Sequence, residues 1–303
     1  MNALVVGYGS IGRRHCRILT EMGCQVSIVS QQEVCLPFSV YETVHAALES
    51  TQPDYVVIAN RTILHSETLC ELRALGYEGK LLIEKPLFDE PKTIPQAYMN
   101  NLFVGYNLRF HPVLMRLREV LESEQVISVQ VYTGQHLSTW RAGDYRTSYS
   151  ARRSEGGGVL RDLSHELDSV QWLFGSWQRV AAIGGHYSSL EIDSDDTFGL
   201  LISTDRCPLV SIQVNYLDTC KRREMLINTN EHTYLADLIC NTLQTDDRVD
   251  TYPCDLDTTY RMQHQSVIAD NYEQLCTAEE ACETMQLIAM AEQSAREERW
   301  MKK

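Results

Sequence analysis

Three glycines near the start of the chain have the spacing of a dinucleotide-binding turn. Gly7, Gly9 and Gly12 form a GxGxxG motif that directly follows an apolar strand at 2–6 and opens a helix at 11–22. In such a turn the first glycine permits the tight bend, the second lets a pyrophosphate approach the backbone, and the third lets helix and strand pack closely. The helix N-terminus adds unpaired N–H groups. We therefore predict that NAD or NADP binds here, to Gly7, Tyr8, Gly9, Ser10, Ile11 and Gly12.

The second predicted strand, at 25–30, leaves the choice between the two dinucleotides open. An NAD site usually has an acidic residue at the end of this strand, which binds the ribose 2′-hydroxyl. Here the strand ends at Ser30 and continues into Gln31, and the first acidic residue is Glu33. Ser30 and Gln31 could hydrogen-bond either a hydroxyl or a 2′-phosphate. We therefore assign Ser30 to the cofactor without choosing between NAD and NADP.

Polar residues follow the next two predicted strands, at the strand ends where ligands of open parallel sheets bind. Asn60 and Thr62 come after the strand at 55–59, and His65 lies at the start of the next helix. Lys85 follows the next apolar strand, and we expect its side chain to point to the same ligand crevice. We assign cofactor contacts to Asn60, Thr62 and His65, although for His65 a structural hydrogen bond is an equally good interpretation.

A cationic segment precedes a run of three glycines in the second half of the chain. Between residues 141 and 161 there are five arginines and two acidic residues. Because arginine binds carboxylates and phosphates bidentately, this segment favours an anionic substrate such as a nucleotide sugar or an acidic sugar. A solvated or ion-paired loop is the alternative. The predicted substrate contacts are Arg141, Tyr145, Arg146, Tyr149 and Arg152, of which the tyrosines could stack on a sugar or hydrogen-bond to it.

The elements that must position these residues fall into two groups. Up to about residue 105, apolar strands alternate with helices, which is typical of a parallel sheet covered on both faces. Beyond 120, strands mostly follow one another directly, which indicates a largely antiparallel sheet. We therefore predict an α/β Rossmann domain with a parallel sheet at 1–120. We predict an α+β domain with a large, mostly antiparallel sheet at 121–303, which binds substrate and forms oligomers.

The expected elements are as follows. In the first domain we expect strands at 2–6, 25–30, 55–59, 81–83 and 102–105, and helices at 11–22, 41–50 and 64–75. In the second we expect strands at 126–132, 179–186, 197–203, 208–216, 225–229 and 233–238, and helices at 158–174, 259–276 and 279–296. A large open sheet must be covered, which predicts a homodimer or a homotetramer.

The composition argues against several classes of partner. The formal net charge of -14 disfavours nucleic acid and anionic membrane surfaces. No stretch approaches the roughly 20 apolar residues needed to span a bilayer, and the N-terminus lacks the basic region of a signal peptide. None of the ten cysteines has CxxC spacing, so we expect reduced thiols and no metal site. These features favour a cytoplasmic protein without nucleic acid or membrane partners.

Four ordered motifs resemble those of the glucose–fructose oxidoreductase / inositol dehydrogenase / MocA family. They are the GxGxxG turn, the tripeptide Glu84-Lys85-Pro86, the segment GYNLRFHP at 105–112, and GGGVLRDLSHELD at 156–168, which leads to WLFG at 172–175. The resemblance covers nearly the whole chain. It implies an NAD(P)-dependent oxidoreductase that acts on a sugar, a cyclitol or a nucleotide-linked sugar. The segment at 144–158 is similar to members associated with surface-glycan synthesis.

The resemblance also implies roles for individual residues. Lys85 would position the substrate hydroxyl and the nicotinamide, His165 would be the general base, and Asp162 would orient the substrate or the histidine. Oxidation of an alcohol needs a proton acceptor that titrates near neutral pH, as histidine does, and a lysine ammonium favours the developing alkoxide. On the same resemblance we assign Glu84, Lys85 and Asn107 to the cofactor and Arg109 to the substrate.

One spacing departs from the common family pattern. Asp162 and His165 are three residues apart, whereas many members have four, although a subset shares the shorter form. Residues three and four apart share a helix face, so the site can still form, but Asp162, Glu166 and Asp168 all stay candidates to assist His165. Two other functions stay open: a non-catalytic sensor of NAD(P) or a sugar, and an enzyme of internal redox chemistry with a tightly held cofactor. The joint presence of Lys85, Asp162 and His165 favours catalysis.

Overall fold

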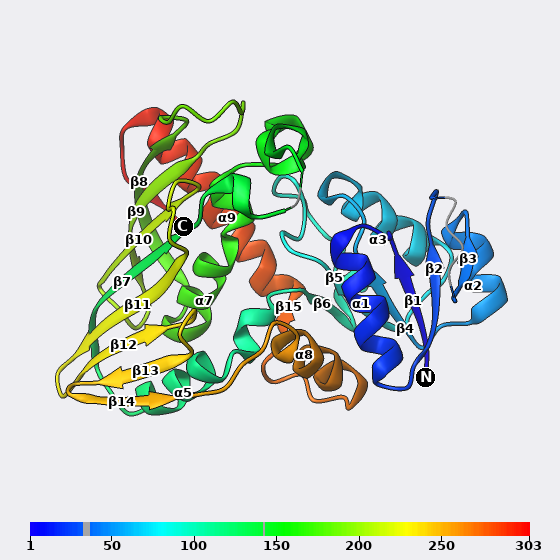
Figure 1. Ribbon diagram of the computed structural model, residues 1–303, viewed down its shortest axis with the longest axis horizontal. Helices are drawn as coiled ribbons and strands as arrows, with labels where there is room; N and C mark the ends of the chain where they lie inside the picture. Colours follow the sequence, from blue (N-terminus) through cyan, green and yellow to red (C-terminus); the bar gives the residue numbers. More distant parts are fainter. Residues whose placement is uncertain (33–36, 142) are drawn as a thin grey trace. The chain divides into compact units, whose positions relative to one another are not determined.

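Short apolar runs form the strands of two separate sheets, one in each of the two units into which the chain divides (Figure 1). The computed structural model describes residues 1–32, 37–141 and 143–303. The first unit contains Met1–Asn107 and Leu256–Cys282, and the second contains Leu108–Asp255 and Glu283–Lys303.

This division differs from the single boundary that we predict at residue 120. Helix α5 (Pro112–Leu121) belongs to the second unit, and the chain returns to the first unit at Leu256. The returning segment contributes α8 (Thr258–Ile268) and β15 (Cys276–Thr277), which pairs antiparallel with an edge strand of the first sheet. The hydrophobic pattern of a segment shows its secondary structure but not the element on which it packs. The sequence alone therefore places residues 256–282 in the second domain, which they follow in the chain.

The first sheet has the strand order β15-β6-β5-β4-β1-β2-β3, and its pairs are parallel except for β15–β6. Every residue of β4 (Tyr55–Ile58) is fully buried, as expected where helices cover both faces of a parallel sheet. The other strands are β1 (Asn2–Val6), β2 (Gln25–Val29), β3 (Ser39–Tyr41), β5 (Lys80–Ile83) and β6 (Leu102–Val104). The predicted parallel, Rossmann-type sheet is confirmed.

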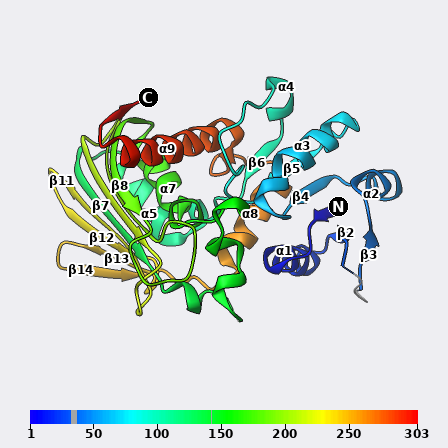
Figure 2. The same cartoon turned by 90° about the horizontal axis from the view of Figure 1, so that it is seen from above.

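Helices cover both faces of this sheet (Figure 2). Helix α1 (Ser10–Glu21) packs with α8 on one side, and α2 (Val44–Thr51) packs with α3 (His65–Ala74) on the other. The buried residues of α1 form one stripe, because they recur at helical spacing: Gly12, His15, Cys16, Ile18 and Leu19. The GxGxxG turn thus joins the carboxyl end of β1 to the start of α1. Two short helices, η1 (Thr62–Leu64) and α4 (Gln96–Met99), complete the unit.

The second sheet has nine strands in the order β14-β13-β12-β11-β7-β10-β9-β8-β16. Its pairs are antiparallel except for β7–β10, so the predicted, mostly antiparallel sheet is confirmed. The strands are β7 (Val126–Gly134), β8 (Trp177–Gly185), β9 (Thr197–Thr204), β10 (Leu209–Asn215), β11 (Arg222–Thr229), β12 (Thr233–Asp237), β13 (Thr242–Thr245), β14 (Arg248–Thr251) and β16 (Met301–Lys302). The strands β13 and β14 were not predicted, because their polar residues lack an apolar alternation.

Three helices, α5, α7 (Ser164–Phe174) and α9 (Ala278–Glu297), lie on one face of the second sheet (Figures 1 and 2). The helix predicted at 158–174 is two pieces, because Leu163 leaves the helical conformation between α6 (Val159–Asp162) and α7. The helix predicted at 259–276 ends at Ile268, and Asp270 follows with φ +56°. The described cysteines are free thiols, and Cys35 lies outside the described residues. Over 1–32, 37–141 and 143–303, no helix is long and apolar enough to cross a bilayer.

Candidate active site

The turn between β1 and α1 shows which of its glycines the fold itself requires. Gly7 has φ +102°, and a Cβ there would lie 2.6 Å from the backbone nitrogen of Asn60. A Cβ on Gly12 would lie 2.1 Å from the carbonyl oxygen of Gly7. A Cβ on Gly9, in contrast, would meet no heavy atom of the described residues within 4 Å. Packing within the chain therefore explains Gly7 and Gly12, whereas the open side of Gly9 leaves room for a ligand to approach the backbone.

The N-terminus of α1 gives this open side an anion-binding character. Gly9 caps the helix without a side-chain hydrogen bond, and the first turn of this fully described helix has no acidic residue. The first N–H groups of the helix are therefore available to a phosphate. The Arg13 guanidinium lies over the Tyr8 ring, 5.2 Å from its centroid, and its Nε donates to the Tyr8 carbonyl oxygen at 3.4 Å. The turn therefore fits the pyrophosphate of a dinucleotide.

The end of β4 contributes one polar group to the same edge of the sheet. The Asn60 amide nitrogen donates to Thr68 Oγ1 at 2.8 Å, while Asn60 Oδ1 is buried with no hydrogen-bond partner among the described residues. His65 is buried, and its Nδ1 lies 3.2 Å from the carbonyl oxygens of Pro86 and Leu87. Burial lowers the pKa of His65 and so favours the neutral ring. These contacts support the structural interpretation of His65, and its cofactor contact stays a prediction.

The end of β2 does not decide between NAD and NADP. Ser30 Oγ accepts a hydrogen bond at 3.1 Å from the backbone N–H two residues later, and Gln31 Nε2 donates to the Glu42 carbonyl oxygen at 2.7 Å. Glu33 lies outside the described residues. The cofactor contacts of Ser30 and Thr62 stay predictions, and both dinucleotides stay open.

Lys85 lies at the carboxyl end of β5, next to Glu84, whose carboxylate contacts a histidine of the same unit. Lys85 is half-buried. Glu84 is buried, and its Oε1 lies 2.9 Å from Nε2 of His15. Asn107 is also buried and donates to Thr259 Oγ1 at 2.6 Å. The Glu84 and Asn107 side chains thus bind other elements of their own unit, and the cofactor contacts predicted for these two residues stay predictions. The role of Lys85 stays a prediction.

In the second unit, the glycine run lets the arginine-rich segment approach α6. A Cβ on Gly157 would lie 2.2 Å from the carbonyl oxygen of Tyr149. Gly158 has φ +124°, and a Cβ there would lie 2.3 Å from Asp195 Oδ1. A side chain at Gly157 would push the segment away from the start of α6, and one at Gly158 would displace Asp195. Gly157 therefore lets Tyr149 lie beside α6, where its side chain contacts Asp162.

Asp162 is held by phenol groups. Tyr216, which follows β10 and is fully buried, donates from its hydroxyl to Asp162 Oδ2 at 2.6 Å. Burial, together with the Asp162 charge, raises the pKa of Tyr216 well above its ordinary range, and the pKa of Tyr149 is raised by the same two causes. Both phenols therefore keep their protons. Trp140 packs edge-on against Tyr216, with ring centroids 5.1 Å apart. His165 follows in the first turn of α7 and is buried.

The other two carboxylates near His165 have partners of their own. Asp168 forms a bidentate ion pair with Arg109, with N–O distances of 3.0 and 2.7 Å, and both side chains are at most 2% exposed. Glu166 Oε1 lies 2.8 Å from Arg223 Nε and accepts from Thr133 Oγ1 at 2.8 Å. These pairs fix α7 in its unit. The choice of the carboxylate that assists His165 and the substrate contact of Arg109 stay predictions.

Most arginines of the cationic segment are neutralised within the unit. The ion pairs are Arg146 with Asp144 (2.7 Å) and Glu191 (2.7 Å), Arg152 with Glu155 (2.8 Å), and Arg161 with Glu292. The ion-paired interpretation thus holds for Arg146 and Arg152, and the Tyr145 hydroxyl accepts from the Glu191 backbone N–H at 3.3 Å. Arg141 differs: it lies over the Tyr149 ring at 4.6 Å, donates to Ser150 Oγ at 3.3 Å, and has no ion pair among the described residues.

A family model matches part of the second unit. The model of the GFO/IDH/MocA C-terminal domain matches residues 114–234, which span the second unit from α5 to β12. This part of the chain is similar to the C-terminal domain of that family. The predicted resemblance is therefore confirmed.

Similar proteins share modest sequence identity with this chain, and the solved structures share its fold. The rhizopine catabolism protein MocA of Rhizobium meliloti is 26% identical over 186 residues, which cover 56% of this chain and 56% of that protein. The chain spans about half the length of the curated relatives it matches. The crystal structure of GenD2 from gentamicin A biosynthesis, in complex with NAD, has a TM-score of 0.84 at 20% identity and covers 100% of this chain and 96% of its own. The WlbA dehydrogenase from Bordetella pertussis, in complex with NADH and UDP-GlcNAcA, has a TM-score of 0.82 at 18% identity and covers 100% and 98%.

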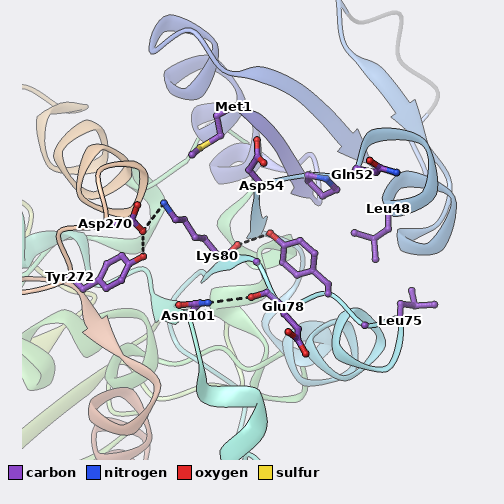
Figure 3. Close-up of a pocket in the computed structure, with 14 residues that line it drawn as sticks. Met1, Leu48, Gln52, Asp54, Leu75, Glu78, Lys80, Asn101, Asp270 and Tyr272 are labelled. Atoms are coloured by element: carbon purple, nitrogen blue, oxygen red, sulfur yellow. Dashed lines mark hydrogen bonds and ion pairs between the residues drawn. The ribbon is translucent and has the colours of Figure 1, made fainter.

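A pocket of about 900 Å³ in the first unit lies at the edge of the sheet away from the glycine turn (Figure 3). Met1, Asp54, Lys80 and Asn101 line it, and these residues precede or begin strands β1, β4, β5 and β6. Open parallel α/β sheets bind ligands at the carboxyl ends of their strands. Lys80 is paired with Asp270 at 2.9 Å. This pocket therefore lies at the wrong edge to hold the dinucleotide.

The sequence did not indicate Tyr216, nor the two histidines that the first unit buries, His15 and His264. Tyr216 follows an apolar strand, where a tyrosine reads as an ordinary core residue. His15 could have been found, because it lies on the apolar stripe of α1 that also carries Ile18 and Leu19, where an unpartnered imidazole is costly. The position of its partner Glu84, 69 residues away, has no signature in the sequence.

Proposed function

We propose that this chain is an NAD(P)-dependent oxidoreductase that transfers hydride between a nicotinamide cofactor and a hydroxyl or keto carbon of a sugar. The observation that carries the proposal is the glycine turn: its first and third glycines are explained by packing, and the second opens toward a ligand. The match of residues 114–234 to the GFO/IDH/MocA C-terminal domain supports it, as do NAD and NADH in the structurally similar GenD2 and WlbA.

The dinucleotide would be held by the backbone N–H groups at the start of α1, with Asn60 Oδ1 as an acceptor beside them. When bound, it would supply the hydride acceptor or donor. The turn has two cationic neighbours, Arg13 over Tyr8 and Arg14 near Asp257 at 3.5 Å. Neither distinguishes a ribose hydroxyl from a 2′-phosphate, so the proposal covers both NAD and NADP.

Residues of the chain would transfer the hydroxyl proton and position the sugar. His165 would take the hydroxyl proton during oxidation and return it during reduction. Asp162, held by the Tyr216 hydroxyl at 2.6 Å, would orient His165 or the sugar. Lys85 would place its ammonium near the reacting hydroxyl and favour the alkoxide that develops there. Retention of all three residues supports an enzyme rather than a sensor.

Arg141 supports an anionic sugar, including a nucleotide-linked sugar of surface-glycan synthesis. Arg141 is an exposed residue, its guanidinium stacks on Tyr149, and it has no ion pair among the described residues, so its charge is available to a carboxylate or a phosphate. Tyr149 in turn contacts Asp162, which places this charge next to the proposed catalytic residues of the same unit. The cocrystallised UDP-GlcNAcA of WlbA agrees with this class of substrate.

The outer face of the second sheet supports a homo-oligomer, either a homodimer or a homotetramer. Ile183, Leu201 and Leu209, on the adjacent strands β8, β9 and β10, are 76%, 46% and 52% exposed. Such exposed apolar surface is typical of an interface, and a second copy presents the same patch in a two-fold arrangement. Light scattering tests this: a mass equal to one 34.6 kDa chain would contradict it.

A turnover assay tests the proposed function. Purified protein is mixed with NAD⁺ or NADP⁺ and a panel of nucleotide sugars, acidic sugars and inositols, and nicotinamide absorbance is followed. We expect reduction with at least one pair, and loss of most of it in Lys85→Met with dinucleotide binding kept. Near wild-type turnover in Lys85→Met would refute the role of Lys85. Dinucleotide binding without turnover on any sugar would favour a sensor, and turnover without net cofactor consumption would favour internal redox chemistry.

A further inference from the structure

A chain of four buried side chains crosses the interior of the first unit and ends beside Lys85. The Tyr55 hydroxyl lies 2.9 Å from His264 Nδ1, His264 Nε2 lies 2.8 Å from His15 Nδ1, and His15 Nε2 lies 2.9 Å from Glu84 Oε1. Tyr55, His264 and His15 are 0% exposed and Glu84 is 7% exposed. The residues come from β4, α8, α1 and the end of β5, and they account for none of the dinucleotide contacts proposed above.

The available N–H and O–H hydrogens determine which atom donates in each of these three hydrogen bonds. A carboxylate only accepts, so His15 Nε2 must carry the hydrogen of the bond to Glu84. If His15 is neutral, its Nδ1 accepts, and His264 Nε2 must donate. A neutral His264 then accepts at Nδ1, and the Tyr55 hydroxyl donates to it. Every bond has one hydrogen in this arrangement, which runs from Tyr55 to Glu84.

The alternative is a doubly protonated His15 that donates from both nitrogens. His264 would then accept at Nε2 and donate from Nδ1 to the Tyr55 oxygen. The Tyr55 hydroxyl hydrogen would need a second acceptor, and the described residues provide no partner for this hydroxyl except His264. A buried donor without an acceptor costs about 1–3 kcal/mol. Burial also lowers the pKa of His264 well below its ordinary range, which agrees with a neutral ring. The geometry therefore favours the chain that starts at Tyr55.

The end of the chain is built to hold the Glu84 carboxylate in one place. Its Oε2 accepts from the Lys85 backbone N–H at 3.2 Å. On the other side, a Cβ on Gly105 would lie 3.0 Å from Glu84 Oε1, so a side chain at this position would crowd the carboxylate. His15 is three residues after Gly12 on α1. The helix that begins at the dinucleotide turn is thus joined, through His15 and Glu84, to the backbone of Lys85.

We propose that His15 is a positioning residue for Lys85, and that the one-way chain Tyr55–His264–His15–Glu84 holds the start of α1 and the Lys85 backbone in fixed register. The inference rests on the proposed function, because Lys85 must act on the sugar for its position to matter. In this role His15 needs an N–H at the Nε2 position, which the amide of a glutamine also supplies.

The first test reads the protonation pattern of the full-length wild-type protein, without a substrate. ¹⁵N-labelled histidine spectra give the tautomer of each ring, and the spectra of His15→Gln and His264→Gln assign the two signals. We expect both rings to be neutral with hydrogen on Nε2. A doubly protonated His15, or hydrogen on Nδ1 of either ring, would overturn the one-way chain.

The second test compares His15→Ala, His15→Gln and a control, His45→Gln, which changes an exposed histidine of α2. We expect His15→Ala to lower kcat/KM for the sugar by about 10- to 100-fold, the scale of a small misplacement of a catalytic group. His15→Gln should recover most of that loss, and His45→Gln should match wild type. Equal losses in His15→Ala and His15→Gln would reduce His15 to a packing role. Wild-type turnover in His15→Ala, beside loss of turnover in Lys85→Met, would refute the positioning role and leave the proposed function intact.

Discussion

Replacement of Arg109 by alanine should destabilise the second unit rather than weaken sugar binding. Arg109 makes two bonds of 3.0 and 2.7 Å to Asp168, and both side chains are at most 2% exposed. Removal of one member leaves the other charge buried without its partner, at a cost of about 3–5 kcal/mol. With an m-value of about 2 kcal/mol/M in urea, the unfolding midpoint should fall by about 2 M.

The positions of the tryptophans allow the unfolding of the second unit to be measured separately. Trp140, Trp172, Trp177 and Trp300 are the four tryptophans of the chain, and all belong to the second unit. Their fluorescence during urea unfolding therefore reports that unit. The control is Arg116→Ala, because Arg116 is exposed and pairs with Glu119 at 2.9 Å, so it should change the free energy of unfolding by less than about 1 kcal/mol.

A double variant distinguishes the effect of the buried charges from the effect of side-chain packing at the same positions. Replacement of Arg109 by methionine together with Asp168 by leucine removes both charges and keeps an apolar interior, so it should recover much of the stability lost in Arg109→Ala. An unchanged urea midpoint in Arg109→Ala, with a raised KM for the sugar, would refute this reasoning and restore Arg109 to the substrate site.

Three further variants test the second unit. Tyr216→Phe removes a donor to the Asp162 carboxylate and should cost about 1.5–3 kcal/mol of stability by the same fluorescence assay; no change would mean that the hydrogen bond contributes nothing. Arg141→Ala should raise KM for an anionic sugar by at least about tenfold, whereas Arg146→Ala, which loses only exposed ion pairs, should not, and the reverse order in steady-state kinetics would contradict the assignment. His165→Ala should lower kcat by about 10²–10⁴-fold, and a loss below about tenfold would point to another base.

The sequence predicts the parts of this fold that depend on local pattern. Apolar runs such as Tyr55–Ile58 and the alternation along β9 mark strands correctly, and the glycine turn is found with the strand and helix that give it meaning. What it misses depends on contacts between distant residues. The return of Leu256–Cys282 to the first unit is one case, because α8 packs against α1, more than 200 residues earlier.

The same distinction applies to the candidate site. Residue type predicted a cationic substrate surface from the arginines at 141–161, but type cannot show that Arg146 pairs with Glu191, 45 residues later. Likewise, the family motif marks Arg109 and Asp168 without showing that each is the partner of the other. The number of charged residues in a segment therefore overstates its unpaired charge, and the substrate contacts predicted for this segment stay predictions.

The most direct test of the central claim is a calorimetric titration of NAD⁺ and NADP⁺ into wild type and Gly9→Val. Gly9 has φ -74°, which valine can adopt, and a Cβ there meets no heavy atom of the described residues within 4 Å, so the variant should fold with an unchanged melting temperature. Its methyl groups would occupy the space through which the pyrophosphate approaches. We predict that wild type binds at least one of the two dinucleotides and that Gly9→Val binds it at least about tenfold more weakly. Binding of neither dinucleotide to wild type, or equal binding to both proteins, would contradict the account.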